Sequence, residues 1–245
     1  MKAAEEERLR REEEAILAAL AAQPKITIDE IEVGQVLDET DLPEDVTPFF
    51  AIYEIAEGDE IYERINGKSY RKNNHVALSD LRYLKVLHYN FHHKPQMGEI
   101  IVNVKIAEDV ISIFRELYEA EYEIQSMYLV DNYWTGDGDS SDSASIDVNN
   151  TSAFNYRNAT GSSNLSRHAY GMAIDLNPQQ NPYLWKSGNR YKYAHDNAAS
   201  FIDRKMDDPH IIVKGDICYE IFKKYGFSWG GEWTNPIDYQ HFEKR

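Results

Sequence analysis

Cysteine is almost absent from this chain of 245 residues, in which Cys218 is the only one. A single thiol forms no disulfide within the chain, and it excludes a zinc cluster built from cysteines. Any metal site must therefore take its ligands from His, Asp and Glu.

Positive charge is also scarce, because 26 Lys and Arg stand against 42 Asp and Glu, a formal net charge of −16. Binding to nucleic acid needs clustered cations that neutralise phosphates. Docking on an anionic lipid surface has the same requirement. The charge balance therefore argues against both, and we expect no nucleic-acid partner.

Long apolar runs are missing near the start of the chain. The longest one there, residues 15–22, has eight residues and directly follows three glutamates. It is too short to cross a membrane and too acidic at its front for a signal peptide. We predict no membrane span, and an exported protein would carry its signal outside this sequence.

The composition is 42% hydrophobic and 12% aromatic, enough for a sizeable core. Residues 1–24 predict a charged, alanine-rich helix or tail that ends at a proline. Residues 25–50 are acidic and contain two prolines, which favours a linker. The globular domain is expected at residues 51–245.

Hydrophobic spacing predicts mixed secondary structure in that domain. Helices are expected over residues 79–87, 106–117 and 216–225, strands over 98–104, 127–130, 171–176 and 239–243, and a solvated polar loop over 136–150. The helices and strands do not alternate in regular βαβ units, so the expected fold class is α+β.

Two histidines have carboxylates nearby in the sequence, which suggests a metal or catalytic site. His168 precedes Asp175 by seven residues, with Gly171 as a break between them, and His241 follows Asp238 by three. Two imidazoles and a carboxylate, with water in the fourth position, make the open tetrahedral zinc site of a hydrolase. Asp238 is then close enough to take a proton from the water.

These motifs resemble a known family. The pattern S-x-H-x-x-G-x-A-x-D at residues 166–175, followed by W-G-G-x-W at 229–233 and D-x-x-H-F at 238–242, is similar to the zinc D-alanyl-D-alanine carboxypeptidases and L-alanyl-D-glutamate endopeptidases of peptidoglycan. The resemblance covers about residues 65–245. It implies a Hedgehog-type fold, with a small antiparallel sheet that carries a zinc site and has helices at its flanks.

The resemblance also implies a role for individual residues. His168, Asp175 and His241 would be the zinc ligands, and Asp238 would be the general base. Arg157 would stabilise the oxyanion. Ser166 and Trp233 would contact the substrate. Alternatives remain open: Glu232 is a rival base, Arg157 a surface ion pair, Ser166 a turn residue and Trp233 a groove wall. Glu243 is a candidate to support His241.

The sequence therefore predicts a zinc peptidase domain at residues 51–245 that cleaves an amide bond in peptidoglycan stem peptides. We expect a monomer located in the cell envelope, periplasmic or extracellular. Carboxypeptidase and endopeptidase activity both stay open. The alternative is a non-catalytic wall-binding module that keeps the fold and the metal.

Overall fold

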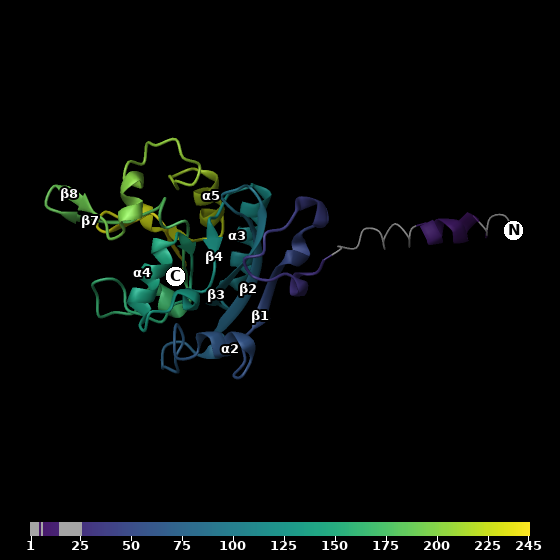
Figure 1. Cartoon of the computed structure of the whole chain (residues 1–245), viewed down its shortest axis with the longest axis horizontal. Helices are drawn as coiled ribbons and strands as arrows, with labels where there is room; N and C mark the ends of the chain where they lie inside the picture. Colours follow the sequence, from purple (N-terminus) through teal and green to yellow (C-terminus); the bar gives the residue numbers. More distant parts are fainter. Residues whose placement is uncertain (1–4, 6, 15–25) are drawn as a thin grey trace.

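The computed structural model describes residues 5, 7–14 and 26–245 (Figure 1). Within the predicted N-terminal helix or tail, residues 5 and 7–14 are helical, and the rest of that prediction lies outside the described residues. No helix in the described part of the chain is both long and apolar enough to cross a membrane.

The regular elements are short apart from two strands and one helix. The helices are α2 (Glu60–Ile65), α3 (Ala107–Glu119), α4 (Gly138–Asp147) and α5 (Ile217–Lys224). The strands are β1 (Phe50–Glu54), β2 (Leu81–Tyr89), β3 (Pro95–Asn103), β4 (Ser126–Met127), β5 (Asn150–Thr151), β6 (Ala173–Asp175), β7 (Tyr183–Ser187), β8 (Arg190–Lys192), β9 (Ser228–Trp229), β10 (Ile237–Asp238) and β11 (His241–Glu243).

The largest sheet has the order β1-β2-β3 and is antiparallel throughout. Helix α3 packs against β1 and β2 with a buried apolar stripe, formed by Val110, Ile113, Phe114 and Leu117. The predicted helix over residues 106–117 is therefore confirmed, and it provides the support for one face of this sheet (Figure 1).

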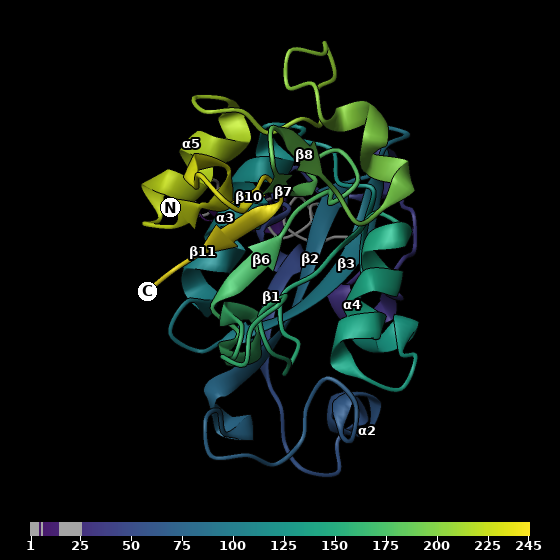
Figure 2. The same cartoon turned by 90° about the vertical axis from the view of Figure 1, so that its left-hand side faces the viewer.

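Two smaller antiparallel sheets carry the C-terminal half, with strand orders β6-β11-β9 and β10-β7-β8. Figure 2 shows β6 and β11 in front of the long strands β2 and β3. Ile174 of β6 and Phe242 of β11 are fully buried in the same core as α3. The fold is thus mixed α and β with small antiparallel sheets, as predicted.

The helix expected over residues 79–87 is wrong, because this segment is strand β2. As the central strand, β2 is hydrogen-bonded on both sides and buried on both faces, so it lacks the alternation of a half-buried strand. Its continuous apolar character matches the spacing of a helix equally well.

The polar loop expected over residues 136–150 is also wrong, since residues 138–147 form helix α4. Asp137 caps this helix by accepting hydrogen bonds from the backbone of Asp139 and Ser140, both at 2.9 Å. The helix buries two serines, Ser141 and Ser145, rather than an apolar stripe. Hydrophobic periodicity cannot detect such a helix.

Residues 26–50, expected to be an acidic linker, place four buried side chains in the main core. Ile31, Leu37, Phe49 and Phe50 are at most 8% exposed. This segment packs on the long sheet rather than forming a loose linker, because most of its apolar residues, though not the exposed Val36, contact the core. The domain boundaries themselves remain a prediction.

Most of the remaining sequence predictions are confirmed with shifted bounds. Residues 216–225 contain α5, which Asp216 caps by accepting from the Tyr219 backbone at 2.7 Å. Residues 171–176 and 239–243 contain β6 and β11, and residues 98–104 contain the second part of β3. The strand predicted at residues 127–130 is wrong except for Met127.

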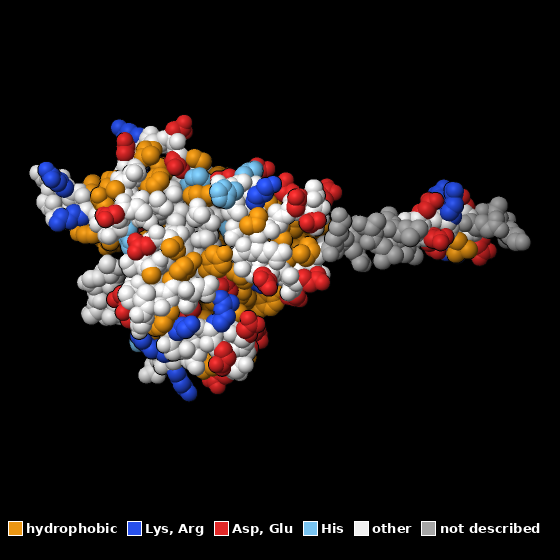
Figure 3. Space-filling view, in the orientation of Figure 1, with side chains coloured by type: hydrophobic (Ala, Val, Ile, Leu, Met, Phe, Trp, Pro, Cys, Tyr) orange, Lys and Arg blue, Asp and Glu red, His pale blue; other side chains and the backbone are white. Residues whose placement is uncertain are grey.

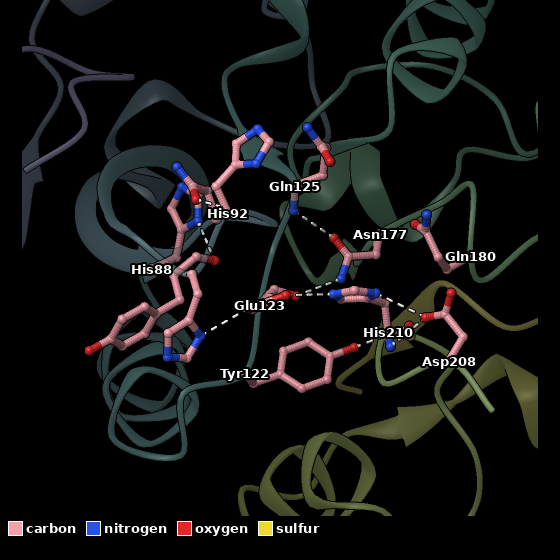
Figure 4. Close-up of polar contacts among 12 residues, drawn as sticks. His88, His92, Tyr122, Glu123, Gln125, Asn177, Gln180, Asp208 and His210 are labelled. Carbon is pink, nitrogen blue, oxygen red and sulfur yellow. Dashed lines mark hydrogen bonds and ion pairs between the residues drawn. The ribbon is translucent and has the colours of Figure 1, made fainter.

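A polar network away from the ligand set joins three segments, as Figure 4 shows. Glu123, in the loop after α3, contacts His93 of the β2–β3 turn at 2.9 Å and His210 of the segment before α5 at 2.8 Å. The other ring nitrogen of His210 lies 2.9 Å from Asp208. Glu123 is therefore the residue that holds these segments together.

We expect Glu123→Ala to lower the free energy of unfolding by about 1–3 kcal/mol, because it removes two charge-assisted hydrogen bonds at a half-buried position. The control is Glu121→Ala, a 64% exposed side chain whose ion pair is with His93 at 3.5 Å. It should cost less than about 0.5 kcal/mol. Chemical denaturation of both variants measures the difference, and equal losses would contradict the bridging role of Glu123.

Candidate metal centre and its cleft

The turn that carries His168 is fixed at both ends. Residues 167–170 form a short 3-10 helix, η6, whose first free N–H groups are capped when Ser166 Oγ accepts from the His168 backbone at 3.3 Å. Gly171 ends the turn at φ 65°, and an added Cβ would lie 2.7 Å from the Asn103 backbone nitrogen. The break that the sequence predicts at Gly171 is therefore real, and only glycine fits it.

Strands β6 and β11 bring the other two candidate ligands together. Their antiparallel register places Asp175 directly opposite His241. Side chains alternate along a strand, so the neighbours Ile174 and Phe242 enter the core while Asp175 and His241 point to the opposite side. The core thus determines which face holds the polar pair.

Three ligand atoms converge in this arrangement. His168 Nε2 lies 3.1 Å from His241 Nδ1 and 3.2 Å from Asp175 Oδ1, and His241 Nδ1 lies 3.0 Å from Asp175 Oδ1. Zinc bonds of about 2.1 Å in tetrahedral geometry separate neighbouring ligand atoms by about 3.3 Å. All three side chains are buried, and within the described residues they form the one group of three His, Asp or Glu side chains close enough to hold a metal ion.

The outer contacts of both rings leave lone pairs facing the centre. His168 Nδ1 lies 2.6 Å from the Ala153 carbonyl, which only accepts, so the proton is on Nδ1 and Nε2 is free. His241 Nε2 likewise faces the Glu243 carboxylate at 3.4 Å, leaving Nδ1 toward the centre. Two nitrogen lone pairs 3.1 Å apart repel unless a cation lies between them, so this donor set fits Zn²⁺.

The pKa values of the candidate ligands also favour a cation at this centre. Burial raises the pKa of Asp175, but the charges and hydrogen bonds of His168 and His241 outweigh it and hold that pKa far below its usual range. Burial lowers the pKa of His241, and the hydrogen bonds that its ring donates to Asp175 and Glu243 more than reverse this, raising the pKa to about 10. A ring so strongly stabilised as a cation is a position where a dication can replace the proton.

A cleft of about 560 Å³ opens over this centre. Its lining contains every site residue that the sequence predicts, namely Arg157, Ser166, His168, Asp175, Trp233, Asp238 and His241. The structure therefore brings together residues that are up to 84 positions apart in the chain.

Asp238 lies in this cleft on β10, with a buried side chain. Its Oδ1 atom is buried and has no hydrogen-bond partner in the described part of the protein. Burial, and after it the negative charge of Asp175, raises the pKa of Asp238 to about 8. The two carboxylates thus have opposite tendencies: Asp175 stays ionised, and Asp238 binds a proton readily.

Gly230 allows the backbone of Asp238 to pass close to the backbone of residue 230. A Cβ at Gly230 would lie 2.5 Å from the Asp238 carbonyl oxygen and 2.9 Å from its Cβ. Gly230 of the motif at residues 229–233 therefore permits close backbone approach.

The rival base, Glu232, does not line the cleft. Its carboxylate accepts from the Tyr219 hydroxyl at 2.9 Å and pairs with Lys214 at 3.1 Å. Those partners lower its pKa, and the Lys214 hydrogen bond contributes most. An exposed carboxylate already neutralised by cations is a poor base for a reaction inside the cleft.

Arg157 is neither exposed nor free. Its side chain is 9% exposed, and Nη2 donates to Asp142 of α4 at 2.7 Å. Nη1 donates to the Asn158 carbonyl at 3.0 Å, while the buried Nε has no partner among the described residues. The alternative of an ordinary surface ion pair does not fit this burial.

Ser166 and Trp233 differ in what they offer a ligand. Ser166 is buried and its hydroxyl is used by the η6 turn, which favours the turn-forming alternative. Trp233 is 37% exposed, and its ring centre lies 5.3 Å from that of His241, so it forms a wall of the cleft beside a ligand.

Sequence reasoning missed two parts of the cleft. Asp139, Asp142, Ser143 and Ile146 line it from one face of α4, a helix that the sequence does not reveal. His195 also lines the cleft, and its Nδ1 lies 2.7 Å from Asp147, the last residue of α4. The spacing of the α4 residues, at i, i+3, i+4 and i+7, is the signal that could have found this wall.

Comparison with known proteins agrees with the motifs. Residues 160–244 match a family model described as D-alanyl-D-alanine carboxypeptidase, which confirms the resemblance predicted from the sequence. No curated protein and no solved structure matches the chain. The matched segment carries the three candidate ligands and Asp238, while Arg157 and α4 precede it.

We expect the purified protein to bind close to one zinc per chain, and His168→Ala or His241→Ala to abolish this binding. His195→Ala is the matched control, because this histidine lines the cleft but is not part of the ligand triangle. Elemental analysis and competition with a chelating dye measure the metal.

The same measurement separates the two carboxylates. Asp175→Asn should weaken zinc binding, since it removes a charged ligand, whereas Asp238→Asn should retain it. The reverse result would exchange the roles of ligand and base.

Proposed function

We propose that this protein is a zinc-dependent peptidase of the cell envelope that hydrolyses an amide bond in peptidoglycan stem peptides, of the D-Ala-D-Ala carboxypeptidase or L-Ala-D-Glu endopeptidase type. The observation that supports it most is one cleft that holds a three-ligand centre and an unpartnered buried carboxylate, Asp238. The family match at residues 160–244 supports the class of substrate.

The metal and Asp238 divide the chemistry. Zn²⁺ bound by the two histidines and Asp175 would act as a Lewis acid on the scissile carbonyl and increase the acidity of a water molecule. Asp238 accepts the proton of the attacking water on its free Oδ1 atom. It then delivers this proton to the nitrogen of the leaving amine, so that one carboxylate serves as base and then as acid.

Arg157 supplies positive charge where the reaction develops negative charge. Its guanidinium is held by Asp142 and the Asn158 carbonyl, so it is fixed before substrate arrives. A fixed donor stabilises the oxyanion of the tetrahedral intermediate without reorganising during the reaction.

A binding module would not need this arrangement. A buried carboxylate without a hydrogen-bond partner lowers the stability of a protein, so its presence favours a functional role. The backbone of Asp238 also lies so close to Gly230 that a larger residue would not fit there. The buried carboxylate therefore favours the enzyme over the non-catalytic alternative.

The test is digestion of a defined pentapeptide stem, with the products weighed by mass spectrometry. Loss of a single terminal residue indicates the carboxypeptidase type, and cleavage after the first residue indicates the endopeptidase type. We expect Asp238→Asn to reduce turnover by about 10²–10⁴-fold, the range for a removed general base. Glu232→Gln is the control and should leave turnover within about twofold. Full activity of Asp238→Asn would move the base elsewhere.

We expect Arg157→Lys to reduce kcat by about 10²-fold, because an ammonium group cannot hold Asp142 and the Asn158 carbonyl while it faces the oxyanion. Asp142→Asn keeps the guanidinium but loosens it, and its kcat should fall between that of Arg157→Lys and that of the wild type. Steady-state kinetics with circular dichroism to verify folding decide the matter. Unchanged kcat in Arg157→Lys would leave Arg157 a purely structural role.

A further inference from the structure

The β7–β8 hairpin is a cationic projection on an acidic protein. Residues 183–193 contain Lys186, Arg190 and Lys192 but no Asp or Glu, in a chain of net charge −16. All three cations are exposed, and none forms an ion pair with an acidic side chain in the part of the chain that the structure describes. Figure 3 shows basic side chains gathered at the left-hand tip of the molecule, where Figure 1 places β7 and β8.

Each face of the hairpin sets a cation beside an aromatic ring. The register pairs Lys186 with Tyr191 on one face and Trp185 with Lys192 on the other. Lys186 Nζ lies 5.7 Å from the centre of the Tyr191 ring, and Tyr191 is 42% exposed. Exposed rings next to unpaired cations present flat apolar area together with a partner for carboxylates.

The hairpin is continuous with the catalytic cleft. Tyr183 and Tyr193, at its two ends, line the cleft. Strand β7 also pairs with β10, which places Tyr183 opposite Asp238. A polymer whose peptide occupies the cleft therefore reaches the hairpin without crossing another element.

We propose that this hairpin is a docking surface for the polymeric substrate, the carboxylate-bearing peptide and sugar chain of peptidoglycan on both sides of the stem that enters the cleft. The inference rests on the proposed function and extends it from the reacting peptide to the polymer around it. Charge complementarity supports it, because the net negative charge of the protein repels a polyanion, and the hairpin places unpaired positive charge directly beside the cleft.

Binding to purified peptidoglycan sacculi tests the proposal, using full-length protein with Asp238→Asn so that the polymer stays intact during sedimentation. The variant Lys186→Gln/Arg190→Gln/Lys192→Gln should bind about tenfold more weakly than Lys72→Gln/Lys105→Gln/Lys205→Gln. The second triple removes the same charge from exposed lysines scattered elsewhere. Equal binding by the two triples would overturn the proposal.

Two further measurements identify the chemistry. Sacculi whose carboxylates have been converted to amides should bind the parent protein as weakly as the hairpin variant does, and so should native sacculi at about 0.5 M salt, where charges are screened within a few Å. Tyr191→Ser should weaken binding while keeping its salt dependence. Equally tight binding of an RNA homopolymer, lost in the hairpin variant, would overturn the proposal in favour of a general polyanion surface.

The outcome stays separate from that of the proposed function. Hydrolysis of the soluble pentapeptide by the otherwise wild-type enzyme reports on the cleft, and the ratio of sacculus to pentapeptide hydrolysis reports on the hairpin. This ratio should fall in the hairpin triple but not in the scattered triple. An enzyme that cleaves no stem peptide refutes the function, whereas an unchanged ratio refutes the hairpin alone.

Discussion

The pairing of β6 with β11 is the constraint on which the site depends. One register sets His241 opposite Asp175, and the same register sends Ile174 and Phe242 into the core. A slip of one residue would bury the two polar side chains and expose the two apolar ones, so the hydrophobic effect opposes it strongly. The packing energy of the core therefore fixes the polar geometry, including two ring nitrogens 3.1 Å apart that repel one another unless a proton or a cation lies between them.

Because core packing fixes the position of the polar ligands, the local parts of the site could be predicted from the sequence. The ligand motifs are local, and the turn at Gly171 and the alternation around Asp175 and His241 follow from a few neighbouring residues. Helix α3 shows its apolar stripe in the same direct way. Such features depend on short-range rules, and so the three ligands and Asp238 could be selected as candidates from the amino-acid sequence alone.

The features that sequence reasoning missed depend on distant partners. Strand β2 looks helical because side chains on both of its faces are buried against other elements, so its apolar residues do not alternate with polar ones. Helix α4 looks like a loop because its buried positions are serines, which hydrogen-bond rather than pack: Ser145 accepts from Asn150 at 3.0 Å, and Ser141 from the Thr135 backbone. Hydrophobic periodicity therefore reveals neither the lining of the cleft by α4 nor the anchoring of Arg157 through Asp142, and the spacing of residues 139, 142, 143 and 146 is the one signal of this helix face.

The lining of the cleft has more acidic side chains than free basic ones. Asp139, Asp142, Asp175, Asp238 and Glu243 line it, whereas its arginines, Arg157 and Arg167, already donate to Asp142 and to the Lys244 carbonyl. A carboxylate-bearing substrate approaching such a surface meets net repulsion until positive charge is added. Under the proposed function, a dication held by the ligand triangle would add it at the reacting bond, and the β7–β8 hairpin would add it along the approach. An acidic protein could then act on an acidic polymer, because both sources of positive charge adjoin the same cleft.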